Sequence, residues 1–106
     1  MHPEVVAFTV GTAKSPDLQY ARRLTRDLGV RHEVVELKPS DLGLAEVKEA
    51  VRVAELTEYG DVINAVVSLA VFERVRDCGI KVVLSGDGSD ELFGGYAMYQ
   101  DIDPAQ

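Results

Sequence analysis

Three carboxylates and two glycines stand close together toward the C-terminal end of the sequence. The glycines are Gly86 and Gly88, and the acids are Asp87, Asp90 and Glu91. Because glycine lacks a Cβ, a phosphate or nucleotide can come close to the backbone N–H groups at these positions. The acids would repel a bare polyphosphate, so a hard cation such as Mg²⁺ would have to lie between them. The pattern therefore predicts a loop that binds a nucleotide together with Mg²⁺.

Two other interpretations fit part of the same loop. Residues 85–93 match, at most positions, one copy of the nonapeptide of calcium-binding β-rolls. A β-roll needs several stacked copies to bury a core, and this sequence holds one copy preceded by an apolar run. The residues Asp-Gly-Ser-Asp are also common in ordinary turns. The choice between these interpretations depends on the longer stretch around the loop.

The loop follows a short apolar run, Lys81–Leu84. An uninterrupted β-branched run is typical of a strand that is buried on both faces of a parallel sheet. Ligands of open α/β sheets lie outside the carboxyl ends of the strands, which is where the loop begins at Ser85. Similar patterns predict parallel strands near 5–10, 32–37 and 81–85, and helices near 16–28, 41–54 and 62–77.

The expected helices have clear sequence signals. Ser15 is a natural N-cap and Pro16 suits the first helical position, while Gly29 follows the end of the same helix. The third helix follows Asp61, a good N-cap, and is apolar nearly all round, so we expect it to be buried. The apolar stripe of the first helix is predicted to consist of Leu18, Ala21, Leu24 and Leu28.

Composition and charge narrow the classes of function. The chain has 106 residues, of which 46% are hydrophobic and 27% charged, as expected of one soluble globular domain. A net charge of −7 without a basic run argues against nucleic acid as a partner. No apolar stretch is long enough for a membrane span and no signal peptide is present, so we expect a cytoplasmic protein without a membrane partner. His32 and the single cysteine, Cys78, are interpreted as structural.

The stretch from Leu84 to Tyr96 resembles the signature of the synthetase domain of glutamine-dependent asparagine synthetases, which belong to the ATP pyrophosphatases. The resemblance continues upstream and covers nearly the whole chain. Ala7–Gly11 is similar to the family's second strand, and Ser15–Leu18 to the start of its next helix. Gly29–Glu33 is similar to the entry to its third strand.

The resemblance implies an α/β fold, a partial doubly wound parallel sheet with helices on both faces, as in the adenine nucleotide alpha hydrolases. The family's first strand and its Ser-Gly-Gly-x-Asp-Ser pyrophosphate loop are expected before Val5, and both are absent, as is the glutaminase half. We therefore expect residues 1–106 to be a partial synthetase domain: a fragment, a truncated frame or one piece of a split protein. With the central strand absent, either strands 5–10 and 81–84 pair directly or a second copy covers the open edge, giving a homo-oligomer.

The resemblance also implies a reaction, ATP-dependent amidation. An acceptor carboxylate, aspartate in asparagine synthetases, attacks the α-phosphorus of ATP, giving an acyl-adenylate and pyrophosphate. Ammonia from a glutaminase domain or a separate chain then displaces AMP. Such chemistry needs positioning and charge neutralisation more than a protein acid or base. We expect this chain by itself to be inactive.

The resemblance gives roles to particular residues. Asp90 is expected to bind Mg²⁺ on the pyrophosphate, and Asp87 to lie at the adenylate or the incoming amine; both are therefore expected to be catalytic. The backbone around Val10 and Gly11 is expected to lie against the adenine of ATP. The residues expected to contact the nucleotide are Val10, Gly11, Ser85, Gly86 and Gly88.

One stretch departs from the family pattern. Asparagine synthetases usually carry a Pro-Ser or Ser-Thr-Pro element near the start of the third helix, whereas this chain has Asn64–Ser68. The acceptor is then aspartate or another carboxylate, as in the related β-lactam synthetases. Glu55 and Glu58 either line the site or are solvated between two helices. An alternative function, outside the class of enzymes, is that of a non-catalytic module that binds nucleotide or serves as an interaction surface.

Overall fold

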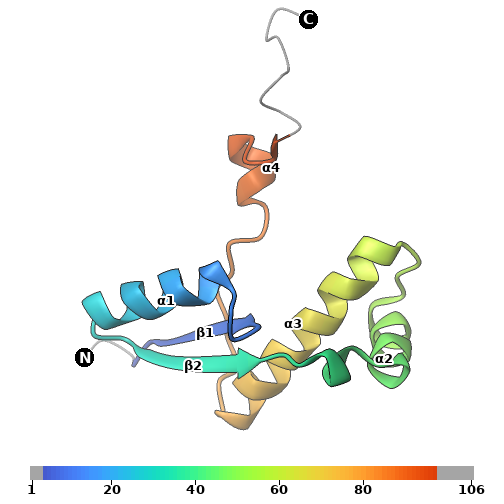
Figure 1. Ribbon diagram of the computed structural model, residues 1–106, viewed down its shortest axis with the longest axis horizontal. Helices are drawn as coiled ribbons and strands as arrows, with labels where there is room; N and C mark the ends of the chain where they lie inside the picture. Colours follow the sequence, from blue (N-terminus) through green and yellow to red (C-terminus); the bar gives the residue numbers. More distant parts are fainter. Residues whose placement is uncertain (1–3, 98–106) are drawn as a thin grey trace, which may run out of the picture.

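The structure is a computed structural model that describes residues 4–97 (Figure 1). Most of the expected elements are present, with bounds that differ by a few residues. The chain forms, in order, β1 (Val6–Gly11), α1 (Pro16–Asp27), β2 (Arg31–Glu36), the short 3-10 helix η1 (Pro39–Leu42), α2 (Leu44–Ala54), α3 (Tyr59–Asp77) and α4 (Ser89–Phe93).

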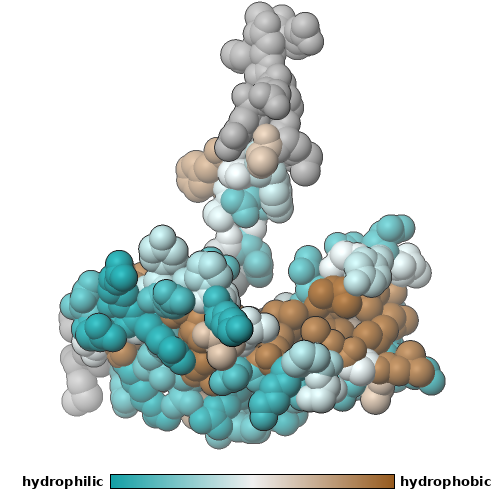
Figure 2. Space-filling model, in the orientation of Figure 1, coloured by the Kyte–Doolittle hydropathy of each residue, from teal (hydrophilic) through white to brown (hydrophobic). Residues whose placement is uncertain are grey.

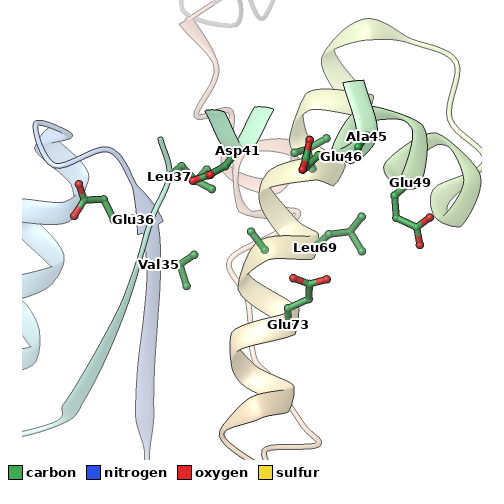
Figure 3. Close-up of a pocket in the computed structure, with 11 residues that line it drawn as sticks. Val35, Glu36, Leu37, Asp41, Ala45, Glu46, Glu49, Leu69 and Glu73 are labelled. Atoms are coloured by element: carbon green, nitrogen blue, oxygen red, sulfur yellow. The ribbon is translucent and has the colours of Figure 1, made fainter. Parts of the chain in front are cut away.

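The two strands form a parallel sheet, with α1 as the connection between them. Their register runs from Val6 opposite Arg31 to Gly11 opposite Glu36. Helix α1 covers one face of this sheet and α3 the other (Figures 1 and 3). The expectation of an α/β fold with parallel strands and helices on both faces is confirmed for residues 4–97. The sheet in this part of the chain has two strands.

Helix α1 packs on the sheet through one narrow row of side chains. Ser15 is its N-cap and Pro16 occupies the first turn, as predicted. Leu18 is 1% exposed, and Thr25 is buried with its hydroxyl donating to the carbonyl of Ala21 over 2.8 Å. The predicted stripe is wrong at Leu24 and Leu28, which are 59% and 66% exposed. A sheet of two strands is too narrow to cover an apolar stripe of that width.

Helices α2 and α3 pack against each other and supply the rest of the core. Ala50 of α2 is fully buried, and Val62, Val66 and Val75 of α3 are also buried. The expectation that this helix is buried all round is wrong, because Phe72 is 53% exposed. Within residues 4–97, the elements that pack on α3 are the two strands and α2.

Helix α3 also begins earlier than expected. Its N-cap is Glu58, and Asp61, the predicted N-cap, lies in the first turn. An acidic residue in the first turn still complements the helix dipole, so Asp61 is compatible with either starting point.

The third predicted strand is absent. Residues 80–86 have no regular secondary structure, and Val82 and Leu84 are 79% and 95% exposed. Direct pairing of this segment with β1 is also wrong, since β1 pairs with β2 alone within residues 4–97. An apolar, β-branched run becomes a strand only when a neighbouring strand satisfies its backbone groups, and this segment pairs with no strand of residues 4–97. It leads away from the sheet to α4, which stands apart (Figure 1).

A three-residue ion cluster joins the sheet to α3. Glu33 of β2 accepts hydrogen bonds from Arg74 of α3 over 2.6 Å and from Arg31 over 2.7 Å. The hydrogen bond from Arg74 and then that from Arg31 lower the pKa of Glu33. Nearby, His32 Nε2 lies 2.9 Å from the Thr9 hydroxyl across the two strands. The interpretation of His32 as a hydrogen-bonded structural residue is confirmed.

Candidate functional site

The glycine turn is a compact local structure that precedes α4. The backbone N–H of Ser89 donates to the carbonyl of Gly86 over 3.1 Å, closing the turn. Inside it, the Ser85 hydroxyl donates to Asp87 Oδ2 over 2.9 Å. Gly88 is the N-cap of α4 and has a φ of 87°, a left-handed conformation that L-residues with a Cβ adopt at a cost. The turn therefore requires glycine at position 88.

Helix α4 places two of the acids on its first turn. Asp90 and Glu91 lie there, where a negative charge is favourable at a helix N-terminus. The carbonyl of Asp90 accepts the N–H of Gly95 over 3.0 Å, and a Cβ on Gly95 would collide with the Asp90 side chain. The double glycine that follows the helix thus leaves room for the Asp90 carboxylate.

Glu91 is held from the far end of the same segment. The Tyr96 hydroxyl donates to Glu91 Oε1 over 2.6 Å, and this hydrogen bond lowers the pKa of Glu91. Glu91 is therefore fixed by a tyrosine, whereas the Asp90 side chain has no hydrogen bond to another side chain within residues 4–97. Between these two acids, Asp90 is the more available for a ligand.

The predicted nucleotide contacts fall into two groups that the structure does not bring together. Val10 and Gly11 end β1, where the carbonyl of Gly11 accepts the N–H of Leu37 over 3.0 Å. Ser85, Gly86 and Gly88 lie on the exposed segment that leads to α4, away from the sheet (Figure 1). No strand at 81–85 is present to hold the second group beside the first. The roles predicted for these residues remain predictions.

The acids of the turn have the chemistry that a magnesium–nucleotide complex requires. Mg²⁺ prefers carboxylate oxygen and, when it binds with a nucleotide, usually takes one or two carboxylates together with phosphate oxygens and water. Asp87 and Asp90 can supply these, and a Cβ at Gly86 or Gly88 would meet no atom within 4 Å. Within residues 4–97, no three His, Cys, Asp or Glu side chains are placed to hold a metal by themselves. The residues therefore fit a metal that shares its ligands with a nucleotide.

A cleft that the sequence did not reveal lies between the carboxyl end of β2, helix η1 and helices α2 and α3. Its volume is about 490 Å³. The lining residues are Val35, Glu36, Leu37, Asp41, Ala45, Glu46, Glu49, Val66, Leu69, Ala70 and Glu73 (Figure 3). The sequence contains one indication of this cleft, because the acids Glu46 and Glu73 stand beside the apolar positions of two helices.

Within the described part of the chain, no helix has the length and apolar character needed to cross a membrane.

Glu55, a candidate site residue, ends α2 in a left-handed conformation with a φ of 53°. Its N–H donates to the carbonyl of Val51 over 2.9 Å, so this conformation closes the helix.

Together, the parallel strands, the flanking helices and the acidic glycine turn define an α/β protein with the residue types of a nucleotide site. Comparison with known proteins identifies the family. The asparagine synthase family model matches residues 1–105. The chain therefore belongs to the asparagine synthase family.

Curated relatives agree with this assignment. A Methanocaldococcus jannaschii protein, provisionally named glutamine-hydrolysing asparagine synthetase 1, is 38% identical over 96% of this chain and 19% of its own length. The glutamine-hydrolysing asparagine synthetase B of Escherichia coli K12 is 31% identical over 92% of this chain and 17% of its own length. Asparagine synthetase 3 of Arabidopsis thaliana is 32% identical over 87% of this chain. The chain spans less than a fifth of the length of these relatives.

Proposed function

We propose that this chain supplies part of the nucleotide site of an ATP-dependent ligase that converts a carboxylate to an amide, with aspartate as the acceptor. The observation that carries the proposal is the turn from Ser85 to Asp90, in which two glycines leave the backbone open beside two carboxylates. Family membership and the names of the relatives support the ligase class. A β-lactam synthetase-like ligase acting on another carboxylate would use the same turn.

Each residue of the turn has a proposed role. Asp90 binds the Mg²⁺ that neutralises the departing pyrophosphate, and Asp87 lies beside the acyl-adenylate or the amine that attacks it. The Ser85 hydroxyl orients Asp87 through the hydrogen bond that the two residues share. Gly86 and Gly88 let the phosphates approach the backbone. Val10 and Gly11, at the end of β1, contact the adenine.

The reaction would proceed in two displacements. The acceptor carboxylate attacks the α-phosphorus of ATP, forming a new P–O bond and releasing pyrophosphate. Ammonia then attacks the acyl carbon, and AMP leaves with the electron pair of the broken C–O bond. The ammonia would come from glutamine, through a glutaminase domain or a separate chain. The names of the relatives as glutamine-hydrolysing enzymes support this source.

A second candidate is a module that binds nucleotide without catalysis. The separation of the turn from Val10 and Gly11 favours it, because the two groups do not form one site within residues 4–97. Binding and turnover therefore need separate measurements. Release of AMP and pyrophosphate from Mg·ATP and aspartate would support the ligase, while binding without release would support the module.

The variant Asp90→Asn tests the metal role. It keeps a hydrogen-bond acceptor but loses the anionic ligand that a hard cation prefers, so we expect weaker Mg²⁺-dependent binding of ATP. Isothermal titration with ATP, with and without Mg²⁺, is the measurement. Asp27→Asn is the matched control, since it removes the same charge from the exposed end of α1. Equal Mg²⁺-dependent affinity in wild type and Asp90→Asn would exclude Asp90 as the ligand.

A further inference from the structure

The cleft between β2, α2 and α3 has an apolar floor. Val35 of β2 and Leu69 of α3 both lie along it, and Val66, which also lines it, is 4% exposed (Figure 3). In the space-filling view, apolar surface is continuous over the region of α2 and α3 (Figure 2). Contiguous exposed apolar surface with a polar border is typical of a binding site.

Two carboxylates at this floor have no partner within residues 4–97. They are Glu46 of α2 and Glu73 of α3, and both line the cleft (Figure 3). The other acids of the cleft differ. The Glu36 side chain points away from α2 and α3 (Figure 3). Asp41 accepts the N–H of Lys38 over 2.9 Å, and Glu49 forms an ion pair with Arg52.

The cleft also lacks a positive charge of its own, since no Lys or Arg is among its lining residues. Arg74, which follows Glu73, is occupied by the ion pair with Glu33. The two free carboxylates therefore present uncompensated negative charge beside apolar surface. Such a surface is complementary to an apolar group with a positive charge next to it.

We propose that this cleft is a docking site for a basic segment of another protein, which inserts an apolar side chain against Val66 and Leu69 and places Lys or Arg beside Glu46 and Glu73. Charge argues against the other occupants. A second copy of the chain carries a net charge of −7, and residues 98–106 contain two aspartates and no Lys, Arg or His. Both would bring negative charge to an acidic surface.

The direct test is a titration with short synthetic peptides, acetylated and amidated at their ends. The probe is Lys-Leu-Lys-Leu-Lys, and the comparison peptides are Lys-Ser-Lys-Ser-Lys and Glu-Leu-Glu-Leu-Glu. The readout is NMR chemical-shift change in the ¹⁵N-labelled full chain at residues of α2 and α3. Burial of one leucine side chain corresponds to about tenfold in affinity or more, so the serine peptide should bind at least that much more weakly. The glutamate peptide should not bind.

Two variants test the carboxylates. Glu46→Gln and Glu73→Gln should each lower the affinity for Lys-Leu-Lys-Leu-Lys about two- to fivefold, the range expected of an exposed charge pair. The control Asp27→Asn removes the same charge on α1, away from the cleft, and should leave the affinity unchanged. A melting curve for each variant shows whether the fold is retained.

Several results would overturn the proposal. Equal binding of the leucine and serine peptides would reduce the interaction to general charge attraction. A loss of affinity in Asp27→Asn as large as that in Glu46→Gln or Glu73→Gln would also show that the attraction is general and not specific to the cleft. Shifts at α2 and α3 that depend on protein concentration, without peptide, would make a second copy the occupant. Chemical shifts at the cleft that change when residues 98–106 are deleted would assign it to the chain's own C-terminal residues.

Discussion

Replacement of Gly88 by alanine should disrupt the start of α4 while leaving the rest of the protein folded. Gly88 has a φ of 87°, and a Cβ there would meet no atom within 4 Å. The cost is therefore conformational, about 1–2 kcal/mol for an L-residue in left-handed backbone. This free energy lowers the population of the native turn about 5- to 30-fold. A five-residue helix that no other element supports cannot absorb such a loss.

The assay for this prediction is the set of Cα chemical shifts of Ser89–Phe93, which report the helix population. Gly86→Ala is the matched control. A Cβ at Gly86 also meets no atom within 4 Å, but Gly86 does not have a positive φ. The helix shifts of the Gly86→Ala variant should be retained, because alanine is compatible with a negative φ.

The melting temperature should be unchanged in both variants, since α4 has no packed interface with another helix or strand of residues 4–97. Equal loss of helix in Gly86→Ala and Gly88→Ala would refute the role of backbone conformation. A lower melting temperature in Gly88→Ala alone would refute the independence of α4.

Three further predictions concern the core and the ion pairs. Leu18→Ala should lower the free energy of unfolding by about 2–5 kcal/mol in a denaturant titration, because Leu18 is 1% exposed, whereas Leu24→Ala, at an exposed site, should change it little. Arg74→Gln should lower the melting temperature at pH 7 but not in strong acid: the pKa of Glu33 is below its ordinary value of 4.5, so the stabilisation is present above that pH and is lost as the pH falls through the lowered pKa. A difference that persisted unchanged in acid would contradict this, and Arg26→Gln is the control. Tyr96→Phe should raise the pKa of Glu91 toward 4.5 in an NMR titration of its carboxyl carbon, and an unchanged value would show that the tyrosine hydroxyl does not set it.

The features that the sequence predicts well depend on neighbouring residues. Ser15 and Pro16 begin α1 as expected, and the chain turns at Gly29 before β2. These signals were sufficient to predict two parallel strands with a helix between them, and β1 and β2 are indeed parallel. These signals are local, so their interpretation does not depend on which other elements are present.

The features that the sequence predicts poorly depend on distant partners. The run at 81–85 has the composition of a buried strand, but within residues 4–97 it pairs with neither β1 nor β2. Leu24 and Leu28 are exposed for a related reason, because α1 faces a sheet of only two strands. The cleft depends on three elements at once, so neither Glu46 nor Glu73 could be recognised as a cleft residue from its own helix.

Within the candidate site, the turn itself was predictable and its location was not. The glycines and acids form the expected compact turn, and Ser85 and Asp87 are joined directly. Their expected position next to Val10 and Gly11 depended on the strand at 81–85. Without that strand, a correct local prediction does not place the two groups together.

The parallel pairing of β1 with β2 has a consequence for how the chain folds. Val6 lies opposite Arg31, with only α1 and its two connections between them in the sequence. Because a whole helix separates the two strands, loop-closure entropy must be lost before they pair, and parallel pairing of this kind is slow compared with helix formation. During synthesis, domains generally fold as units from the N-terminal end. The packed elements end at Asp77, so the nascent chain can complete its core before the acidic turn emerges from the ribosome.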